Sequence, residues 1–577
     1  MFVENFVVRT RPKESTALAF PRRYSRMGIN GDGSTLNLDF TAMSTLDSRF
    51  TFSRTSNATY INSSGYVAWN NSNLFYNTAW TSTSLPTGWA EGAVTGTFTY
   101  NGNGTITMTV ATAQRAYLHP AFPYTPTQIG VPFTISCTVT AVSGSPTLAD
   151  VITTNAGTDT FTVNGVAKTS AEILFANDLI TCTSTATANA TVPRIGMGVL
   201  SAVTNKSITL KNPQANIGST AQTYTPNTST TTSYYAPRFD YDPTTLAAKG
   251  LLIEGQGINL TNYSGTFDTA FWNFDGFTRT IVTGTAPSGT GQSILQTQNA
   301  AGGNIRSNAI TVTASTAYTF SFWAKNNGGT KASYRVWNAS AGSAIVDHTS
   351  PSSSYFAQLS STVWNRISVT FTTPAGCTSI FIYTISENSS GGNLFVWGAQ
   401  LELGTSASSY IPTVASQVTR AQELCTLPIT PASIGLTTSP IGTCFYEATV
   451  NHLPTSGFPL IVGFTDIGNN SKAWLSQTST TGSNYSAWKT TTGTVEDVTF
   501  ANVVIPKTSF KFASSISSTQ NLASRNGTAG TAGAVSSAVL SVPTQLNFGG
   551  VIESMIITKF KFFPSAKSQA ELNALST

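Results

Sequence analysis

Short runs in which apolar and polar residues alternate, bounded by Gly, Asn and Ser, recur along most of this chain. A period of two places every second side chain on the same face of a β-strand, so each run predicts a strand with one face in a core. The runs are Phe50–Arg54, Thr59–Ile61, Thr105–Val110, Phe133–Val139, Ala317–Trp323, Ser333–Trp337, Arg366–Phe371, Thr378–Thr384, Cys444–Val450 and Leu460–Phe464. Short strands at this spacing predict an all-β protein made of β-sandwiches.

One helix is predicted, at the end of the chain. The strand-like run Met555–Phe563 meets a proline, and Ser568–Glu571 (SQAE) then has the capping-box pattern. In that pattern the Ser hydroxyl accepts from the amide three residues on, and the Glu carboxylate accepts from the Ser amide. Leu572 and Leu575 give this helix a small apolar face. Thr244–Leu252 could add one or two helical turns.

One segment of the chain occurs twice. Ser207–Pro226 (SITLKNPQANIGSTAQTYTP) is a weaker copy of Asn393–Pro412 (NLFVWGAQLELGTSASSYIP), which lies 186 residues further along. The matching positions are Gln214 and Gln400, Gly218 and Gly404, Ala221 and Ala407, Tyr224 and Tyr410, and Pro226 and Pro412. The same offset relates Asn73-Leu74 to Asn259-Leu260. Because solenoid repeats span only about 20–50 residues, this repeat predicts two related modules in series.

These patterns divide the chain into six expected segments. They are an N-terminal arm at 1–35, a β-rich connecting segment at 36–72, a first module at 73–226, a linker at 227–258, a second module at 259–413 and a C-terminal domain at 414–577. Small modules in series usually bind other molecules or build assemblies, and they seldom carry out chemistry.

The composition is that of a folded, weakly charged chain. Charged residues make up 10% and aromatic residues 11%, against about 25% charged residues in typical domains. The net charge of +5 is thinly spread, so no nucleic-acid partner is expected. No run approaches the ~18 apolar residues of a membrane span, and no signal peptide is visible. A local basic excess lies in the N-terminal arm, which we expect to dock on another protein: Arg9, Arg11, Lys13, Arg22, Arg23 and Arg26.

The cysteines are odd in number and form no Cys-x-x-Cys pair. They are Cys137, Cys182, Cys377, Cys425 and Cys444. Neither a disulfide framework nor a zinc site is predicted, and single buried thiols suit assembly in a reducing cytoplasm. Asp466 with Asn469 and Asn470 is a weak candidate for a cation site, and an ordinary turn is the favoured interpretation. We predict no metal and no cofactor.

Six short segments share a resemblance to one class of protein. They are Phe52–Tyr60 (FSRTSNATY), Pro237–Pro243 (PRFDYDP), Lys249–Glu254 (KGLLIE), Asn259-Leu260, Trp397–Glu402 (WGAQLE) and Ser409–Thr413 (SYIPT). These segments resemble the recurrent sequence of bacteriophage virion proteins of the tail-fibre and head-fibre kind. In that family the first segment runs almost directly into the second. The first module is therefore interpreted as an insertion that arose by duplication of the second.

The resemblance implies a fold and a role. The two modules resemble jelly-roll carbohydrate-binding domains. The C-terminal part resembles a concanavalin A-like, laminin-G-type lectin sandwich, whose closing strand and helix match Phe560–Leu572. The expected fold is thus all-β: tandem jelly-roll sandwiches, then a concanavalin A-like sandwich with one short C-terminal helix. The family implies a structural virion component, often trimeric and assembled in the host cytoplasm, that contacts other tail or capsid proteins.

Catalysis is not predicted. A glycosidase needs two carboxyl groups ~5–10 Å apart across a groove. Asp240 and Asp242 could share a strand face but lie in the linker motif, and Glu402 has no partner in its motif. Glu496 and Asp497 are adjacent, so on a strand they point to opposite faces. The histidines are isolated from one another: His119, His348 and His452.

Tryptophans and their neighbours are the better candidates for sugar contact, because aromatic faces stack on the C–H surfaces of sugars. On the strand predicted over 333–337, Arg335 and Trp337 lie on one face and Tyr334 and Val336 on the other. If the latter pair faces the core, the former makes a solvent-facing platform. In the C-terminal domain the candidates are Trp474, Tyr485 and Trp488, and those expected in a core are Trp323, Trp364 and Trp397. Packing between domains or subunits is the alternative for each candidate.

Three functions follow from these observations. The first is a tail fibre that attaches to host surface glycans through its sandwiches. The second is a capsid-decorating or architectural head-fibre protein without a receptor role. The third is a polysaccharide-degrading tailspike, which is ranked last because no convincing acid pair is present.

Overall fold

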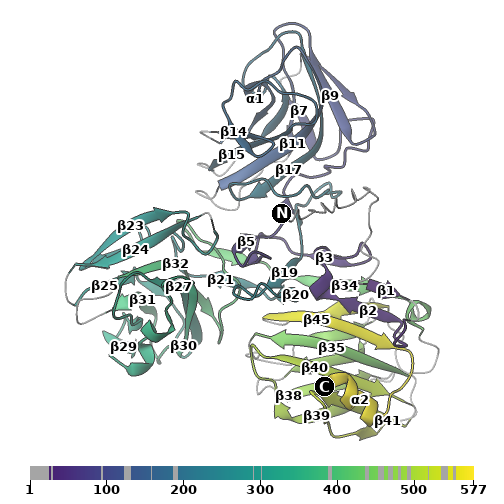
Figure 1. The fold of residues 1–577 in the computed structure, drawn as a ribbon, viewed down its shortest axis with the longest axis vertical. Coiled ribbons are helices and arrows are strands. Elements are labelled where there is room, and N and C mark those ends of the chain that lie inside the picture. Colours follow the sequence, from purple (N-terminus) through teal and green to yellow (C-terminus); the bar gives the residue numbers. More distant parts are fainter. Residues whose placement is uncertain are drawn as a thin grey trace, which may run out of the picture.

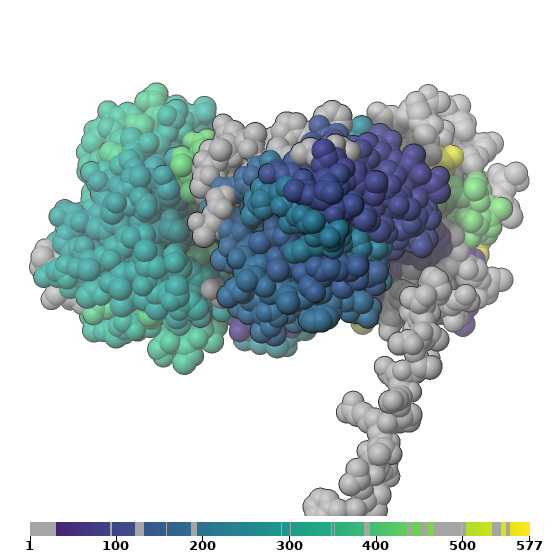
Figure 2. Space-filling model, turned by 90° about the horizontal axis from the view of Figure 1, so that it is seen from above, coloured from purple at the N-terminus to yellow at the C-terminus, as the bar shows by residue number. Residues whose placement is uncertain are grey.

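The computed structural model describes residues 25–27 and 30–577, apart from 93–94, 122–131, 157–158, 186–192, 290, 300–301, 348, 387–392, 436–440, 452–459, 466–471, 479–482, 490–494, 518, 535–543 and 550–553. The described residues form β-sandwiches arranged in three lobes (Figure 1). Every strand pair among them is antiparallel, and the prediction of an all-β fold is confirmed. Seen from above, the second module stands beside the first as a separate lobe (Figure 2).

The first module is a sandwich of two sheets. One sheet has the strand order β12 (Ile152–Thr153), β16 (Arg194–Met197), β10 (Ala116–Pro120), β7 (Trp89–Gly92). The other has the order β14 (Val166–Lys168), β13 (Thr160–Val163), β15 (Leu179–Thr185), β11 (Pro132–Ser143), β17 (Lys206–Ile217), β9 (Thr105–Val110), β8 (Thr97–Tyr100). On β9 the alternate residues Ile106, Met108 and Val110 are buried in the core between the sheets, as the sequence pattern predicts.

The second module is built in the same way. Its first sheet has the order β22 (Trp272–Asp275), β25 (Asn304–Ser307), β31 (Ser379–Ser386), β28 (Arg335–Asn338), β29 (Ser343–Val346), and β26 (Ile310–Thr311) also pairs with β31. Its second sheet has the order β23 (Phe277–Thr283), β24 (Gln292–Gln298), β32 (Leu394–Leu403), β27 (Ala317–Asn326), β30 (Asn365–Thr372). Phe320 and Phe322 of β27 and Ile380 and Ile382 of β31 face each other across this core.

The C-terminal sandwich has two larger sheets. The first has the order β1 (Ser25–Met27), β2 (Leu36–Asp39), β45 (Ser554–Phe563), β35 (Gly442–Val450), β40 (Ser509–Ile516), β41 (Gln520–Arg525), β42 (Thr528–Ala529), with β19 (Arg238–Tyr241), β20 (Ala248–Glu254) and β43 (Gly533–Ala534) beside this path. The second has the order β3 (Thr51–Ser53), β34 (Leu424–Pro428), β44 (Gln545–Phe548), β36 (Leu460–Thr465), β37 (Lys472–Thr478), β38 (Ser483–Lys489), β39 (Val495–Val503). Three two-stranded ribbons connect the lobes: β4 (Thr59–Ile61) with β5 (Val67–Trp69), β6 (Ser72–Asn73) with β18 (Tyr234–Tyr235), and β21 (Gly257–Asn259) with β33 (Val418–Arg420).

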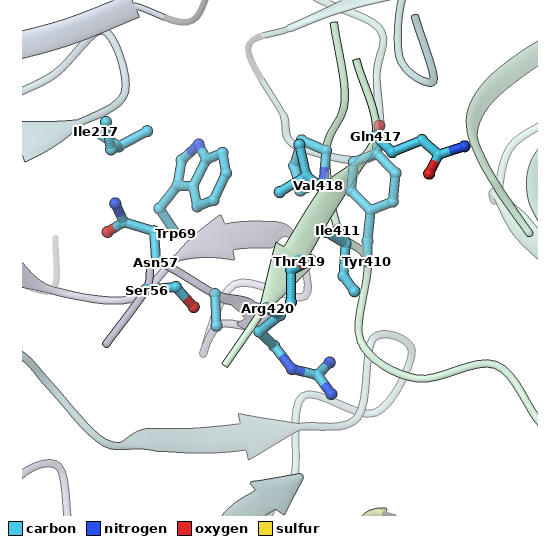
Figure 3. Close-up of a pocket in the computed structure, with 12 residues that line it drawn as sticks. Ser56, Asn57, Trp69, Ile217, Tyr410, Ile411, Gln417, Val418, Thr419 and Arg420 are labelled. Atoms are coloured by element: carbon cyan, nitrogen blue, oxygen red, sulfur yellow. The ribbon is translucent and has the colours of Figure 1, made fainter. Parts of the chain in front are cut away.

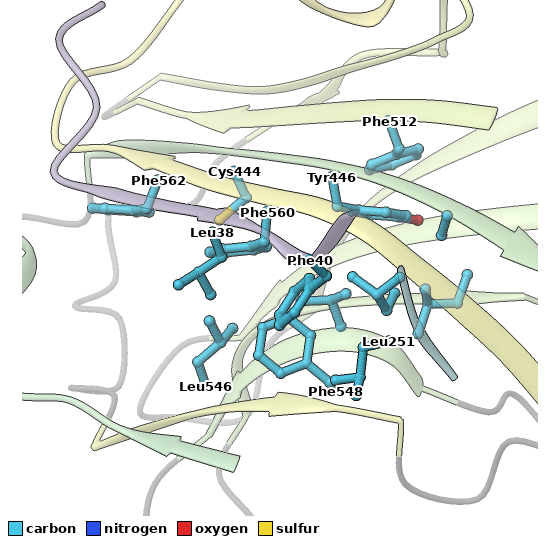
Figure 4. Close-up of a cluster of buried hydrophobic side chains, with 14 of the residues drawn as sticks. Leu38, Phe40, Leu251, Cys444, Tyr446, Phe512, Leu546, Phe548, Phe560 and Phe562 are labelled. Carbon is cyan, nitrogen blue, oxygen red and sulfur yellow. The ribbon is translucent and has the colours of Figure 1, made fainter. Parts of the chain in front are cut away.

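The segments expected to connect the modules are part of the C-terminal sandwich. Strand β2 pairs with β45, β3 pairs with β34, and β20 pairs with β45. Leu38, Phe40 and Leu251 are fully buried among Phe548 and Phe560 (Figure 4). The prediction of helical turns within Thr244–Leu252 is wrong, because burial of both faces of β20 and its pairing with β45 outweigh local helix propensity.

The helices among the described residues are few and short. The capping box of Ser568 and Glu571 is confirmed at α2 (Gln569–Ser576), where the Ser568 amide donates to Glu571 at 2.8 Å. A single-turn helix that we did not predict, α1 (Leu148–Val151), lies in the first module. It begins with a second capping box, in which the Thr147 amide donates to the Asp150 carboxylate at 2.8 Å.

The matched positions of the repeat make the same hydrogen bonds in both modules. Asn73 Nδ2 donates to the carbonyls of Pro213 (3.1 Å) and Thr225 (2.9 Å). Asn259 Nδ2 donates to the residues at the same offset, the carbonyls of Ala399 (3.1 Å) and Ile411 (2.8 Å). Likewise the amide of Thr225 donates to Gln214 Oε1, and that of Ile411 to Gln400 Oε1. Each buried Asn therefore ties the end of its module to the strand before it.

Candidate functional site

The first sheet of the second module has an outer face that carries Arg335 and Trp337. Tyr334 and Val336 are buried in the module core, at 9% and 0% exposure, so the expected alternation is confirmed. Arg335 and Trp337 are half-buried on the opposite face. The second sheet of the module is turned toward the other lobes, because its Trp323 and Trp397 pack against Val67 of the connecting ribbon.

Three further residues complete this face. Register pairs Arg335 with Tyr383 and Trp337 with Phe381, and it pairs Arg306 with Tyr383 on the other side of β31. The guanidinium carbon of Arg335 lies 4.1 Å from the ring centroid of Trp337 and 5.6 Å from that of Tyr383. That of Arg306 lies 4.5 Å from the ring centroid of Phe381. We call these five residues the aromatic–arginine face.

The aromatic–arginine face carries two guanidinium groups, those of Arg306 and Arg335. Among the residues that the structure describes, no carboxylate lies within ion-pairing distance of Arg306 or Arg335. Burial raises the pKa of the Tyr383 hydroxyl, and the two guanidinium groups oppose this rise, which places both charges close to that ring. The carboxylate of Asp275 at the edge strand β22 accepts a hydrogen bond from Asn304 at 3.3 Å.

The other expected sugar contacts lie in the C-terminal sandwich. Trp474 on β37 pairs with Trp488 on β38, and Tyr485 pairs with Gln477. Their backbones thus adjoin one another on neighbouring strands, while their side chains lie outside the described residues. Of the basic residues of the arm, Arg26 lies in β1, where its backbone pairs with Asn37 of β2. The others lie outside the described residues: Arg9, Arg11, Lys13, Arg22 and Arg23.

The candidate acids bind different groups. Asp240 Oδ1 accepts from the Ile61 amide at 2.8 Å, and its Oδ2 lies 3.8 Å from Lys249 Nζ. Asp242 instead accepts from the amides of the turn after it. Glu402 is buried and is hydrogen-bonded by Ser408 and Gln400. Glu496 and Asp497 adjoin each other on β39, as expected.

The remaining polar candidates stand apart from these acids. His119 Nδ1 lies 2.8 Å from the carbonyl of Pro120. His348, His452, Asp466, Asn469 and Asn470 lie outside the described residues. All five cysteines are buried and unpaired, as predicted. Within the described part of the chain, no three His, Cys, Asp or Glu side chains gather as they do around a metal.

Asp240 predicts a pH-dependent stability. Burial raises its pKa from 3.8 to about 6, against the opposing effects of Lys249 and the Ile61 amide. Its contribution to stability is therefore fully present below pH 3.8 and is lost as the pH rises through about 6. We expect the stability of Asp240→Asn relative to the wild type to be about 2–2.5 kcal/mol greater at pH 8 than at pH 4. The free energy of urea unfolding of both proteins, measured at the two pH values, gives this difference.

Asp242→Asn is the matched control, with the opposite sign. Hydrogen bonds from the Thr245 and Thr244 amides lower the pKa of Asp242. Its contribution to stability is present above its ordinary pKa and is lost as the pH falls. A gain at high pH in both variants would contradict the assignment of the effect to burial of Asp240.

The segments that carry the virion-protein resemblance meet in a buried charged cluster. Its members are Arg54, Arg238, Glu254, Arg420 and Glu423, and each side chain is at most 1% exposed. Arg238 donates to both oxygens of Glu423, at 2.9 and 2.5 Å, and also contacts Glu254 at 2.8 Å. Arg420 reaches Glu254 at 2.8 Å, and Arg54 pairs with Glu423. We call these five residues the charged junction.

The charged junction holds the second module against the C-terminal sandwich. The Ser409 amide and hydroxyl of the second module donate to Glu254, at 2.9 and 2.5 Å. Burial by itself would raise the pKa of Glu254, but Arg420 and Arg238 outweigh it and hold that pKa well below its ordinary value. Arg238 and Arg54 likewise outweigh burial and lower the pKa of Glu423. Both carboxylates are therefore ionised and act as bridges.

A small pocket of about 210 Å³ lies beside the charged junction. Trp69 and Ile217 line one side of it, and Tyr410 and Val418 line the other (Figure 3). The carboxamide of Asn57 in its wall is buried and makes no hydrogen bond to any residue that the structure describes. The pocket joins the connecting ribbon, the first module and the end of the second module.

Comparisons with known proteins give resemblances of fold alone. No family model matches the chain, and no curated protein matches it. Among solved structures, the binding domain of Paraclostridial Mosquitocidal Protein 1 is 12% identical, with a TM-score of 0.24, over 28% of this chain and 43% of that chain. The botulinum neurotoxin serotype D binding domain is 11% identical, with a TM-score of 0.24, over 26% and 39%.

A third similar structure is the Ruminococcus gnavus IT-sialidase CBM40 bound to α2,6-sialyllactose. It is 13% identical, with a TM-score of 0.22, over 25% of this chain and 87% of that chain. The chain spans about two fifths of the length of the two toxin binding domains. At these scores the resemblances assign neither a ligand nor an activity.

The described part of the chain contains no helix with the length and apolar character of a membrane span.

Proposed function

We propose that this protein is a bacteriophage virion fibre, a tail fibre that attaches to host surface glycans through its β-sandwiches. The observation that carries the glycan-binding part is the aromatic–arginine face. Trp337 offers an aromatic surface for a sugar ring, and Arg335 beside it offers hydrogen-bond donors for hydroxyl groups. The face lies on a rigid sheet, on the side of the second module away from the charged junction.

The virion part of the proposal rests on the resemblance of the motifs and on where they meet. Arg54, Arg238, Glu254 and Ser409 belong to four of the resembling segments, and all four side chains contact one another through the charged junction. Such a junction holds the second module at a fixed orientation to the C-terminal sandwich. A fixed orientation suits a fibre that must present a binding face at a distance. Docking on tail proteins through the basic arm, and trimerisation, belong to the same proposal.

No catalytic role is proposed. Asp240 is committed to Ile61 and Lys249, and Glu402 to Ser408 and Gln400. The groups that contact these two carboxylates include no second carboxylate. A glycosidase would need a pair of carboxyl groups. In a trimer, three weak sugar sites would instead gain strength through effective concentration.

The test is binding of the labelled full chain to a panel of bacterial cells, with and without periodate oxidation of the surface glycans. We expect binding that is lost on oxidation and that falls at least about tenfold in Trp337→Ala, since a truncated aromatic hot spot costs about 2 kcal/mol or more. The matched control is Phe175→Ala, which removes a ring that is 64% exposed on the first module.

The opposite results would redirect the proposal. Binding that resists periodate, or that Trp337→Ala leaves unchanged, would remove the aromatic–arginine face from the attachment site. No binding to any strain would favour a capsid-decorating or architectural protein, which imaging of the protein on intact particles would then identify.

A further inference from the structure

Arg335 is unusual among the buried and half-buried arginines because its hydrogen-bonding capacity is unused. A guanidinium group carries five N–H donors. Within the described structure Arg335 makes no hydrogen bond and no ion pair, and its Nε is buried without a partner. By contrast, Arg238 of the charged junction donates to Glu423, Thr59 and Ser409. A buried donor without a partner costs free energy, so a ligand that accepts a hydrogen bond from Arg335 would be favoured.

The second guanidinium group of the face is nearly as free. Arg306 makes one long hydrogen bond, from Nη1 to the carbonyl of Ser307 at 3.4 Å. Its charge, like that of Arg335, has no carboxylate partner in the described residues. Arg306 lies over Phe381 of β31 and Arg335 over Trp337 of β28, and the strands of the two arginines, β25 and β28, both pair with β31. Two unneutralised cations on one face attract an anion, and they do so most strongly where water is partly excluded.

The surroundings of Arg335 suit a carboxylate that is carried by a sugar. The contact with the Trp337 ring restrains the guanidinium group, so less entropy is lost when it binds. A planar guanidinium group can pair with the carboxylate of an acidic sugar through two parallel N–H···O bonds. Arg335 lies over one face of the Trp337 ring, so the C–H face of the sugar that carries this carboxylate would pack against the edge or the other face of that ring.

We propose that the aromatic–arginine face recognises an acidic glycan, with the carboxylate of a sugar residue on Arg335 and the sugar ring on Trp337. Arg306 supplies a second positive charge for the same chain. This inference rests on the proposed glycan-binding function and adds the chemical class of the ligand.

The test uses the full chain and pairs of polysaccharides that differ in one group. The probes are polygalacturonate, alginate, hyaluronan and polysialic acid, each with its carboxyl-reduced, neutral form, and dextran sulfate as an anion without carboxylates. We expect at least one acidic polymer to bind, and its affinity to fall about tenfold or more on carboxyl reduction. Binding should also weaken as salt rises from about 0.1 M to about 1 M.

Variants assign the effect to the face. Arg335→Gln should lose about as much affinity for the acidic polymer as carboxyl reduction does. It should lose much less affinity for the neutral form, because the glutamine amide can still donate to hydroxyl groups. Arg335→Lys keeps the charge and should recover part of the loss. Arg279→Gln removes a half-buried arginine from the other sheet of the same module, where it donates to the Thr266 carbonyl, and should change nothing. Thermal unfolding of each variant checks that it is folded.

Three outcomes overturn the inference. In the first, the acidic and the carboxyl-reduced polymers bind with equal affinity, and both lose binding in Trp337→Ala. This result would support glycan binding at the face and contradict recognition of the carboxylate. The second is binding of dextran sulfate as tightly as the carboxylate polymers. The third is the absence of binding to every carboxylated polymer while periodate-sensitive binding to cells persists. Failure of the cell-binding experiment itself would instead count against the proposed function.

Discussion

Glu423→Gln is expected to lower the free energy of unfolding by about 3–5 kcal/mol, the loss typical when one partner of a buried ion pair is removed. Glu423 is fully buried and pairs with both Arg54 and Arg238. A neutral amide in its place leaves two guanidinium groups without their shared counter-ion in a site that water does not reach. Glu254 alone would then face three arginines. Chemical denaturation, followed by tryptophan fluorescence, measures the loss.

The matched control is a carboxylate that pairs on the surface. Glu172 lies 2.6 Å from Lys168, with side chains 35% and 33% exposed, so Glu172→Gln should cost at most about 1 kcal/mol. The pKa of Glu423 is lowered from 4.5 in the folded protein. Its contribution is therefore present above pH 4.5 and is lost as the pH falls, so the difference between wild type and Glu423→Gln should shrink in acid. Equal costs for the two variants would contradict a structural role for the charged junction.

The charged junction shows where prediction from the sequence stops. Composition and motif resemblance single out the segments around Arg54, Arg238 and Glu254, yet Arg54 and Glu423 are 369 residues apart and Arg238 and Glu423 are 185 apart. The alternation of apolar and polar residues predicts which face of a strand each residue occupies. It does not predict which strand pairs with it. Thus the sequence indicates the faces, and the partners become visible only in the fold.

The same limit applies within the aromatic–arginine face. Arg335 and Trp337 could be predicted because local alternation sets them opposite Tyr334 and Val336. The alternation of TSIFIYT likewise separates Phe381 from the buried isoleucines around it, but its position across from Trp337 depends on a register between distant strands. Trp323 and Trp397 are buried as expected, although they pack against the connecting ribbon at the edge of the module and not inside it.

An isolated fragment 414–577 is expected not to fold, although the sequence predicts it as a separate domain. Leu36, Leu38, Phe40, Leu251 and Ile253 come from outside this fragment, and each is at most 1% exposed in the C-terminal core. Without β2 and β20, the long strand β45 loses both of these partners on one edge, and without β3 the neighbouring sheet loses an end strand. An exposed apolar strand edge of this kind favours aggregation.

The fragment 259–413 is the control, because the core of the second module is drawn from residues 260–401 alone. We expect it to unfold cooperatively on heating, while 414–577 gives no cooperative transition and binds a hydrophobic dye. In the full chain, Phe40→Ala should cost about 3–5 kcal/mol. Phe40 is fully buried, with its ring 5.3 Å from that of Phe548 in an edge-to-face contact (Figure 4). A cooperative transition of the isolated fragment 414–577 would mean that this sandwich folds without the strands from 36–53 and 248–254, which would contradict the prediction.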